Sequence, residues 1–221
     1  MMSDIKKTAV IFGASGLVGG ELVKLLIADT RYEKIKLFTR SPLNINIPYV
    51  EEYVIDFEKL DQYDEEISGH HVFCCLGTTA KKTPDKKAYD NIDFHWPVNI
   101  SRICERNGSE AFAVISSIGA NPNSSVFYLR TKGLMENAVL QSKVKKIIIV
   151  RPSFLLGKRG EARLGEKFVN IIAGFLSVFM VGVLKKYKPI HAYEVAGAMI
   201  FAANHSLDKS IFESNELLHL V

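Results

Sequence analysis

The sequence has few cysteines, and their placement excludes a disulfide framework. Only three of the 221 residues are cysteines, and no C-x-x-C pair occurs. Cys74 and Cys75 are adjacent and cannot easily bridge to each other, and three is an odd number for a set of bridges. The chain begins with MMSDIKK, which has no apolar signal core. We therefore expect a reducing, cytoplasmic setting.

The sequence also lacks charge clusters, low-complexity blocks and metal-ligand motifs. The formal net charge is only +4, and the lysines and arginines are scattered, whereas a nucleic-acid-binding surface would group them. No spacing of His, Cys, Asp and Glu predicts a metal site. What is present is a hydrophobic fraction of 48% with 24% charged residues, which predicts a folded protein with one substantial core.

One long apolar run stands against the general absence of membrane signals. It extends from Phe168 to Leu184 and contains Asn170 and Ser177. Its length is below the roughly 20 residues that a spanning helix needs, so we expect no stable membrane span. The run predicts a buried helix, or two short ones, under a substrate cleft. The alternative is a patch that faces a membrane peripherally or covers the interface of a homodimer.

Short apolar runs rich in β-branched residues alternate with helical patterns along the chain. The strands are expected at residues 8–12, 35–39, 53–55, 71–75, 112–116 and 146–150. The helices are expected at residues 17–28, 84–106 with Thr83 as N-cap, 128–142 and 193–203. This alternation predicts a doubly wound, mostly parallel α/β sheet with helices on both faces and a ligand crevice at the carboxyl ends of the strands. We expect one domain over residues 1–221, in which residues 152–192 form a small C-terminal substrate-side region.

A glycine-rich stretch, GASGLVG, joins the first strand to the first helix at residues 13–19. Gly13 permits a tight turn, Gly16 lets the backbone approach a pyrophosphate, and Gly19 lets the helix lie close to the strand. The free N–H groups at the helix N-terminus would bind phosphates. The spacing G-x-x-G-x-x-G departs from the usual G-x-G-x-x-G, and a plain tight turn is the alternative. The strand–turn–helix context favours dinucleotide binding.

The end of the second strand carries no acidic residue, which bears on the choice of dinucleotide. An NAD site usually has Asp or Glu at this point, to hold the ribose hydroxyls. Thr39, Arg40 and Ser41 stand there instead. Arg40 can stack on adenine and pair with a 2′-phosphate, so the sequence favours NADP(H) over NAD(H). A surface arginine that simply follows a strand is the alternative.

A second candidate cofactor loop, CLGTT at residues 75–79, follows the fourth expected strand. Gly77 allows close approach to a ligand, and Thr78 and Thr79 offer hydroxyl groups. This loop should lie beside the glycine loop, where the strand order of such sheets reverses. A simple turn before the next helix is the alternative.

A possible proton-transfer set follows the fifth strand. Tyr128 and Lys132 are four residues apart, so they share one face of the expected helix. The reference pKa of a phenol is about 10, and a neighbouring ammonium lowers it. Ser116 or Ser117 at the strand end would hold a substrate oxygen, which gains or loses a proton as hydride moves to or from its carbon. Tyr-x-x-x-Lys is common by chance, but its order after a serine pair and a glycine loop predicts an oxidoreductase.

Together these motifs resemble the short-chain dehydrogenase/reductase superfamily, and in particular its atypical branch of Tat-interacting-protein type oxidoreductases. The resemblance covers nearly the whole chain and is carried by residues 13–19, 75–79, 116–120, 128–133 and 150–159. It implies a Rossmann fold, an NADP(H) cofactor and a Ser–Tyr–Lys catalytic site. Tyr128 would be the proton donor or acceptor, with Lys132 as its partner on the nicotinamide ribose. Ser117 would orient the substrate, with Ser116 as the alternative.

The resemblance also implies further site residues. Asp56 and Phe57 would border the adenine, Asn91 would lie on the helix under the active site, and Pro152 with Ser153 would pass near the nicotinamide. Arg151, Arg159 and Arg163 are candidates for an anionic substrate group. The complete set of expected cofactor contacts is Gly13, Ser15, Gly16, Leu17, Val18, Arg40, Ser41, Asp56, Phe57, Cys75, Leu76, Gly77, Thr78, Ser116, Tyr128, Lys132 and Pro152.

The sequence thus predicts an NADP(H)-dependent oxidoreductase that acts on a small carbonyl or alcohol substrate. One alternative is an NADPH-binding sensor or protein-interaction regulator with little or no turnover, because a fold alone does not fix a function. A nucleotide-sugar epimerase or dehydratase ranks last, because the chain is short for the usual sugar-binding extension.

Overall fold

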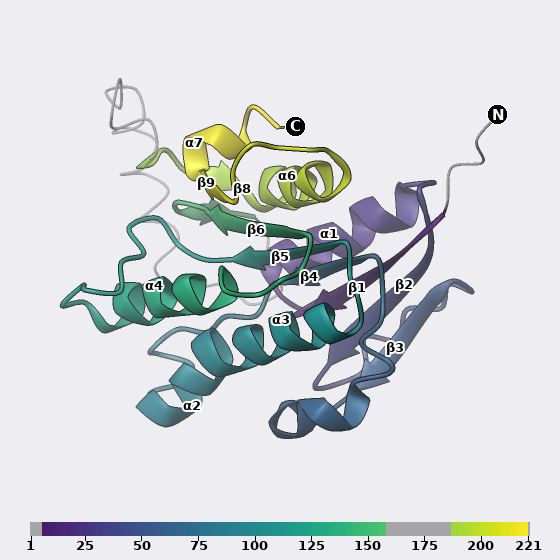
Figure 1. Ribbon diagram of the computed structural model, residues 1–221, viewed down its shortest axis with the longest axis horizontal. Coiled ribbons are helices and arrows are strands. Elements are labelled where there is room, and N and C mark those ends of the chain that lie inside the picture. Colours follow the sequence, from purple (N-terminus) through teal and green to yellow (C-terminus); the bar gives the residue numbers. More distant parts are fainter. Residues whose placement is uncertain (1–5, 158–186, 221) are drawn as a thin grey trace.

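The computed structural model describes residues 6–157 and 187–220 (Figure 1). At its centre lies a seven-stranded sheet in the order β3-β2-β1-β4-β5-β6-β9. These strands are β1 (Lys7–Phe12), β2 (Tyr32–Thr39), β3 (Val50–Val54), β4 (His71–Cys74), β5 (Ala111–Ile115), β6 (Lys146–Arg151) and β9 (Ile211–Glu213). Every pairing in this sheet is parallel, which confirms the doubly wound Rossmann architecture.

Helices cover both faces of the sheet, as expected (Figure 1). α1 (Leu17–Ala28) and α6 (Ala192–Asn204) pack on one face. α3 (Trp96–Arg106) and α4 (Phe127–Val139) pack on the other. The shorter helical elements are the 3₁₀-helix η1 (Phe57–Tyr63), α2 (Lys86–Asp90), the π-helix η2 (Asn91–His95) and α7 (Ser214–Leu217).

The composition of the strands explains why both faces are covered. Successive side chains of a strand point to opposite faces, so a strand between two helical layers needs apolar residues at every position. In β1, Ala9 and Ile11 join the core beneath α1 and α6, whereas Val10 and Phe12 join the core beneath α3 and α4. All four are fully buried. The unalternated apolar run at residues 9–12 is therefore a central strand.

The long helix expected from Pro84 begins later and is interrupted. Its N-cap is Asp85, whose carboxylate accepts a hydrogen bond from the Ala88 N–H at 2.7 Å. The expectation of Thr83 as the cap was wrong, because the Thr83 hydroxyl pairs instead with that of Thr78 at 2.8 Å. After α2 the chain makes one π-helical turn, η2, before α3 begins at Trp96.

Some elements had no signal in the sequence. β9 joins the edge of the sheet beside β6, and a two-stranded pair forms from β7 (Leu155–Leu156) and β8 (Ile190–His191). The apolar run from Phe168 to Leu184, with Arg159 and Arg163, lies outside the described residues. Its roles, and the assignment of residues 152–192 to the substrate side of a single domain, stay predictions. Within residues 6–157 and 187–220, no helix combines the length and apolar character that crossing a bilayer requires.

Candidate functional site

The glycine loop (residues 13–19) and the second loop (residues 75–79) lie against each other. β1 and β4 are neighbours in the sheet, and the strand order reverses at β1. The Cys75 N–H donates to the Phe12 carbonyl at 2.9 Å. Gly13 has a φ of 81°, and a Cβ added there would stand 2.7 Å from the Cys75 carbonyl oxygen. The two loops therefore lie at the switch point of the strand order, which is where doubly wound sheets bind ligands.

The glycine loop has the close packing that a phosphate-binding turn requires. The Gly16 N–H donates to the Gly13 carbonyl at 2.9 Å, and Gly16 is the N-cap of α1. A Cβ on Gly19 would lie only 2.1 Å from the Gly13 carbonyl oxygen, so helix and strand approach closely. The first turn of α1 has no acidic residue, and its N–H groups can donate hydrogen bonds to an anionic ligand. The Val18 side chain is buried, so only its main chain is available for the predicted contact with the cofactor.

The adenosine end of the expected site lies beyond β2 and β3. Arg40 and Ser41 are exposed just after the last residue of β2. Asp56 caps η1 by accepting a hydrogen bond from the Glu58 N–H at 3.0 Å. The Phe57 ring is buried against Trp96, with 4.9 Å between ring centroids. Only the main chain of Phe57 is therefore available for the predicted contact with adenine.

Lys132 forms a buried ion pair that the sequence did not reveal. Its Nζ lies 2.8 Å from Asp93 Oδ1, and the side chains are 3% and 1% exposed. The same Nζ donates to the Ile115 carbonyl at the end of β5 at 3.2 Å. Burial alone would lower the pKa of the Lys132 ammonium, but the charges of Asp93 and then Tyr128 hold that pKa above its usual value. Lys132 is therefore an ammonium at neutral pH.

Tyr128 lies one turn before Lys132 on α4, as the spacing predicted. Tyr128 is 36% exposed, and it lies close enough to Lys132 for the two side chains to interact electrostatically. Gly77 leaves space above the ion pair, since a Cβ there would stand 3.5 Å from Asp93 Oδ1 and 4.0 Å from Lys132 Nζ. The second loop thus passes directly over the charged end of Lys132.

The two serines lie at the end of β5, at the same edge of the sheet. Ser116 is buried, and its Oγ has no hydrogen-bond partner among the described residues. Ser117 is partly exposed, and its Oγ makes only a long hydrogen bond of 3.3 Å to the Ile118 carbonyl. A buried hydroxyl without a partner is costly, so a ligand atom that accepts its hydrogen bond would stabilise the site. Which serine orients a substrate stays a prediction.

Asn91, expected under the active site, points elsewhere. Its Nδ2 donates to Glu58 Oε1 at 3.0 Å. Asp93, two residues later, occupies the place beside Lys132, and its Oδ2 accepts a hydrogen bond from the Thr78 N–H at 2.9 Å. Both residues belong to η2, whose wider turn changes the direction in which side chains point. A buried lysine needs a counter-charge, but the sequence did not show which of the nearby aspartates supplies it.

The segment after β6 is held by polar contacts of its own. The Arg151 guanidinium pairs with Glu136 at 2.5 Å and with Glu213 at 2.9 Å, which joins α4, β6 and β9. Since both arms are engaged, the structure argues against the predicted role of Arg151 with an anionic substrate. Pro152 is buried and its carbonyl accepts from the Ile118 N–H, while Ser153 donates to the Lys188 carbonyl.

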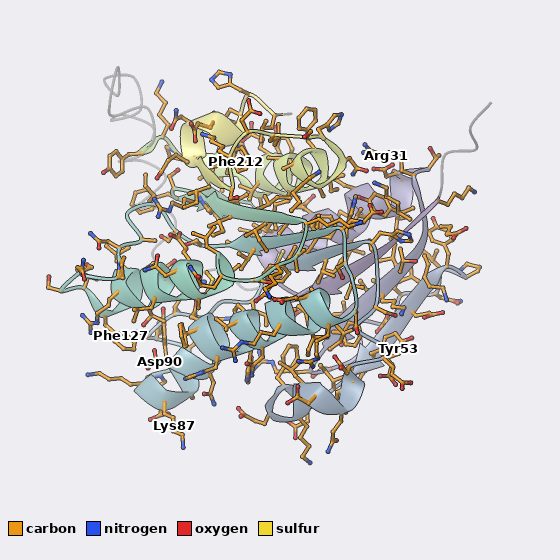
Figure 2. All side chains as sticks on the ribbon, in the orientation of Figure 1. Arg31, Tyr53, Lys87, Asp90, Phe127 and Phe212 are labelled. Atoms are coloured by element: carbon orange, nitrogen blue, oxygen red, sulfur yellow. The ribbon has the colours of Figure 1, made fainter. Side chains whose placement is uncertain are left out.

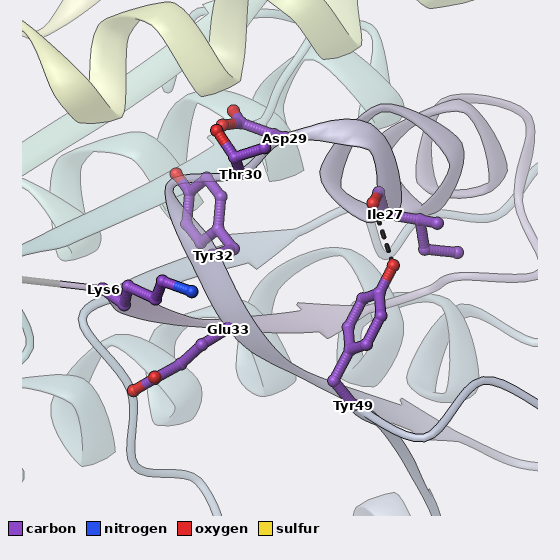
Figure 3. Close-up of a pocket in the computed structure, with 7 residues that line it drawn as sticks. All are labelled: Lys6, Ile27, Asp29, Thr30, Tyr32, Glu33 and Tyr49. Atoms are coloured by element: carbon purple, nitrogen blue, oxygen red, sulfur yellow. Dashed lines mark hydrogen bonds between the residues drawn. The ribbon is translucent and has the colours of Figure 1, made fainter.

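A different cavity, of about 310 Å³, lies at the amino ends of β1 and β2, whereas the candidate cofactor loops follow the carboxyl ends of the strands (Figure 3). Its lining includes Lys6, just before β1, Asp29, just before β2, and Glu33, near the start of β2. Tyr49 closes one side by donating to the Ile27 carbonyl at 3.0 Å. Arg31 marks this edge in Figure 2, far from Phe127 at the start of α4. The cavity is therefore remote from both candidate cofactor loops.

The described residues fit a dinucleotide and offer no metal centre. Closely packed glycines, helix N–H groups, an unpaired Ser116 hydroxyl and a buried ammonium lie at the carboxyl ends of the central strands. Nowhere in the described parts of the chain do three or more His, Cys, Asp or Glu side chains gather closely enough to hold a metal ion.

Comparison with known proteins agrees with this geometry. A family model described as NAD(P)H-binding matches residues 13–170. Protein HTATIP2 of Rattus norvegicus is 35% identical over 174 residues, which covers 77% of this chain and 72% of that protein. The mitochondrial protein FMP52 of Candida glabrata is 30% identical over 234 residues, which covers 98% and 96%.

Solved structures share the fold at low identity. MoeE5 in complex with UDP-glucuronic acid and NAD has a TM-score of 0.71 and 17% identity, over 92% of this chain and 74% of that chain. WbmG of Bordetella bronchiseptica in complex with NAD has a TM-score of 0.70 and 10% identity, over 94% and 72%. The resemblance inferred from the motifs is thereby confirmed. The chain belongs to the NAD(P)H-binding Rossmann family and is a homologue of Protein HTATIP2.

Proposed function

We propose that this protein is an NADP(H)-dependent oxidoreductase that interconverts a small carbonyl compound and its alcohol. The observation that carries the proposal is the buried Lys132 ammonium one helical turn from the half-exposed Tyr128, at the crevice beside the glycine loop. Membership of an NAD(P)H-binding family supports the choice of cofactor class.

Each element of the site has a defined task in this proposal. When bound, the nicotinamide would supply or accept the hydride at the substrate carbon. The N–H groups of the glycine loop and α1 would hold the phosphates, and Arg40 would pair with the 2′-phosphate. The hydroxyl of Ser117, or that of Ser116, would donate a hydrogen bond to the substrate oxygen.

The phenol of Tyr128 would move the proton. In the reducing direction, its Oη gives a proton to the substrate oxygen, and in the oxidising direction it takes one back. The Lys132 ammonium stabilises the phenolate that remains. Because Lys132 is only 3% exposed, water screens its field weakly, and its effect on the phenol is larger than that of a surface lysine.

The test is Tyr128→Phe, which removes the reacting oxygen and keeps the ring. We expect turnover on an identified substrate to fall by about 10²- to 10⁴-fold, the usual contribution of a general acid or base. NADPH affinity should change little, because the phosphates are held elsewhere. Tyr193→Phe is a matched control, since Tyr193 is another half-exposed tyrosine but lies on α6. Wild-type turnover in Tyr128→Phe would sink this assignment.

The preference for NADPH over NADH is tested by fluorescence titration. A charge-assisted hydrogen bond contributes about 1.5–3 kcal/mol, so we expect NADPH to bind at least about tenfold more tightly than NADH. Arg40→Ala should remove this difference by weakening NADPH alone, whereas Arg102→Ala, at an exposed site on α3, should leave it intact. Equal affinities in the wild type would refute the preference.

An NADPH sensor without turnover is the alternative, and it shares the cofactor site. NADPH binding together with no NADPH oxidation across a broad set of carbonyl compounds would favour the sensor.

We also propose a cytoplasmic location and a homodimer. Three free, mostly buried cysteines support a reducing compartment, although the FMP52 relatives are named mitochondrial. Cell fractionation and the mass in solution would test these two points.

A further inference from the structure

Asp93 stands between two parts of the site that the sequence motifs treat separately. Its Oδ1 lies 2.8 Å from Lys132 Nζ, and its Oδ2 accepts a hydrogen bond from the Thr78 N–H at 2.9 Å. One carboxylate therefore contacts the lysine of the proton-transfer set and the main chain of the second loop. The carboxylate is buried, so water cannot replace either contact.

The π-helical turn places Asp93 in this position. η2 interrupts an otherwise α-helical run between α2 and α3, and two residues shortly before Asp93 have other partners. Asp90 accepts from the Thr131 hydroxyl at 3.2 Å, and Asn91 donates to Glu58. Irregular turns of this kind persist where the structure around them compensates for the weaker hydrogen bonding. The buried contacts of Asp93 supply that compensation.

The surroundings of Lys132 leave Asp93 as its counter-charge. The Lys132 ammonium donates to the Ile115 carbonyl of β5, and Tyr128 of the same helix, α4, interacts with it electrostatically. From β4 it meets the Cys74 thiol, whose pKa burial raises to about 12, so that this thiol is neutral. Tyr89, close to Asp93 and Tyr128, also has a pKa raised by burial. Among these neighbours in the described part of the chain, Asp93 is the one carboxylate.

We propose that Asp93 is a positioning residue, which holds Lys132 as a buried ammonium and ties it to the second loop through Thr78. Its use in catalysis rests on the proposed function, whereas its effect on Lys132 does not. Without the carboxylate, a lysine with 3% exposure would keep its desolvation cost and lose its ion pair. Lys132 would then lose its proton at a lower pH than in the wild type, and above that pH the phenol of Tyr128 would lose the neighbouring positive charge.

The first test uses the protein without any cofactor. Thermal unfolding is compared for the wild type, Asp93→Asn, Lys132→Met and the double variant, between pH 7 and pH 9.5. In Asp93→Asn the folded state should hold the Lys132 proton less tightly than the unfolded state does. Stability then rises with pH wherever the unfolded chain binds more protons. Relative to the wild type, Asp93→Asn should therefore gain melting temperature as the pH rises.

The controls separate charge pairing from loop support. The double variant should melt higher than Asp93→Asn at pH 7, because it has no unpaired buried ammonium. Asp90→Asn, on the neighbouring turn, should follow the pH dependence of the wild type. If Asp93→Asn does not fold and the double variant does, the proposal is supported. It is overturned if the double variant is no more stable than Asp93→Asn, if neither folds, or if the pH dependence of Asp93→Asn matches the wild type.

A second readout is NADPH affinity by fluorescence across the same pH range. We expect Asp93→Asn to bind nearly as the wild type does at pH 7 and to weaken by about tenfold toward the level of Lys132→Met as pH rises. A uniform loss at every pH would mean that Asp93 only supports the loop, and would overturn the proposal. If the wild type itself binds no NADPH, the proposed function fails, whereas the cofactor-free unfolding result still decides the role of Asp93.

Discussion

Acidification should destabilise this protein through one buried imidazole, that of His71. His71 opens β4 and is 1% exposed. Its Nε2 lies 3.2 Å from Lys7 Nζ and its Nδ1 lies 2.7 Å from the Tyr32 hydroxyl. An ammonium can only donate, so Nε2 accepts and Nδ1 carries the proton. The Tyr32 oxygen then accepts from Nδ1 and also from Asn204 Nδ2 at 2.8 Å, and the native imidazole is neutral.

The magnitude follows from the pKa. Burial first, and then the charges of Lys7 and Lys146, lower the pKa of His71 from 6.5 to about 3. As the pH falls below 6.5, the unfolded chain takes up this proton before the folded protein does. The stability from the neutral imidazole is therefore full above pH 6.5 and is lost progressively toward pH 3. Between pH 7 and pH 4.5 the loss from this one group is about 2–3 kcal/mol.

The assay is urea unfolding at pH 7 and pH 4.5 for the wild type and His71→Asn. The asparagine amide can still donate toward Tyr32 and does not titrate, although the variant should be less stable at pH 7. We expect the acid-induced loss of unfolding free energy to be smaller in His71→Asn than in the wild type by about 2–3 kcal/mol. His219→Asn, at an exposed histidine, should lose as much as the wild type does. Equal losses in His71→Asn and the wild type would refute the reasoning.

Three further outcomes follow from close contacts in the described structure. Gly19→Ala should abolish NADPH binding and lower the melting temperature, because its Cβ would stand 2.1 Å from a carbonyl oxygen; Gly20→Ala, with its nearest atom at 3.6 Å, should change neither. Glu136→Gln leaves the Arg151 guanidinium with the Glu213 carboxylate alone and should lower the free energy of urea unfolding by about 3 kcal/mol. Replacing both Glu136 and Arg151 by methionine should lower it by less. Burial raises the pKa of all three cysteine thiols, so a thiol reagent at pH 8 should label them only after unfolding, and labelling of the native protein would contradict this.

The central strands and the glycine loop were predictable because their signals are local. A parallel strand covered on both faces needs apolar side chains along its buried length, and residues 9–12 of β1 and 72–74 of β4 show that run directly. The bounds of α1 were predicted correctly, since a glycine turn precedes it and its apolar face recurs at helical spacing. The close approach inferred for Gly19 is present in the structure.

The rest depended on tertiary contacts that no short window of sequence contains. The start of α2 was misplaced by two residues because both Thr83 and Asp85 are suitable caps, and the hydroxyl of Thr78 engages the first. The π-helical turn and the role of Asp93 depend on Lys132, which is 39 positions further along the chain. β9 is only three residues long, and its place is set by pairing with β6. The sequence favoured Arg151 as a ligand-binding arginine, but in the fold its guanidinium pairs with Glu136 and Glu213.

The strands bury a charged ammonium near their carboxyl ends and a neutral imidazole at their amino ends. This difference affects how a loss of turnover at acidic pH should be interpreted. At the carboxyl edge, the raised pKa of Lys132 keeps the ammonium charged as the pH falls. At the amino edge, His71 is neutral and loses its stabilising effect below pH 6.5. We therefore expect a decline in turnover between pH 6 and pH 4.5 to reflect unfolding caused by His71, and not titration of the Lys132 ammonium. If this is so, the decline should coincide with loss of the circular dichroism signal. A decline in a protein that stays folded would instead place the titrating group in the crevice.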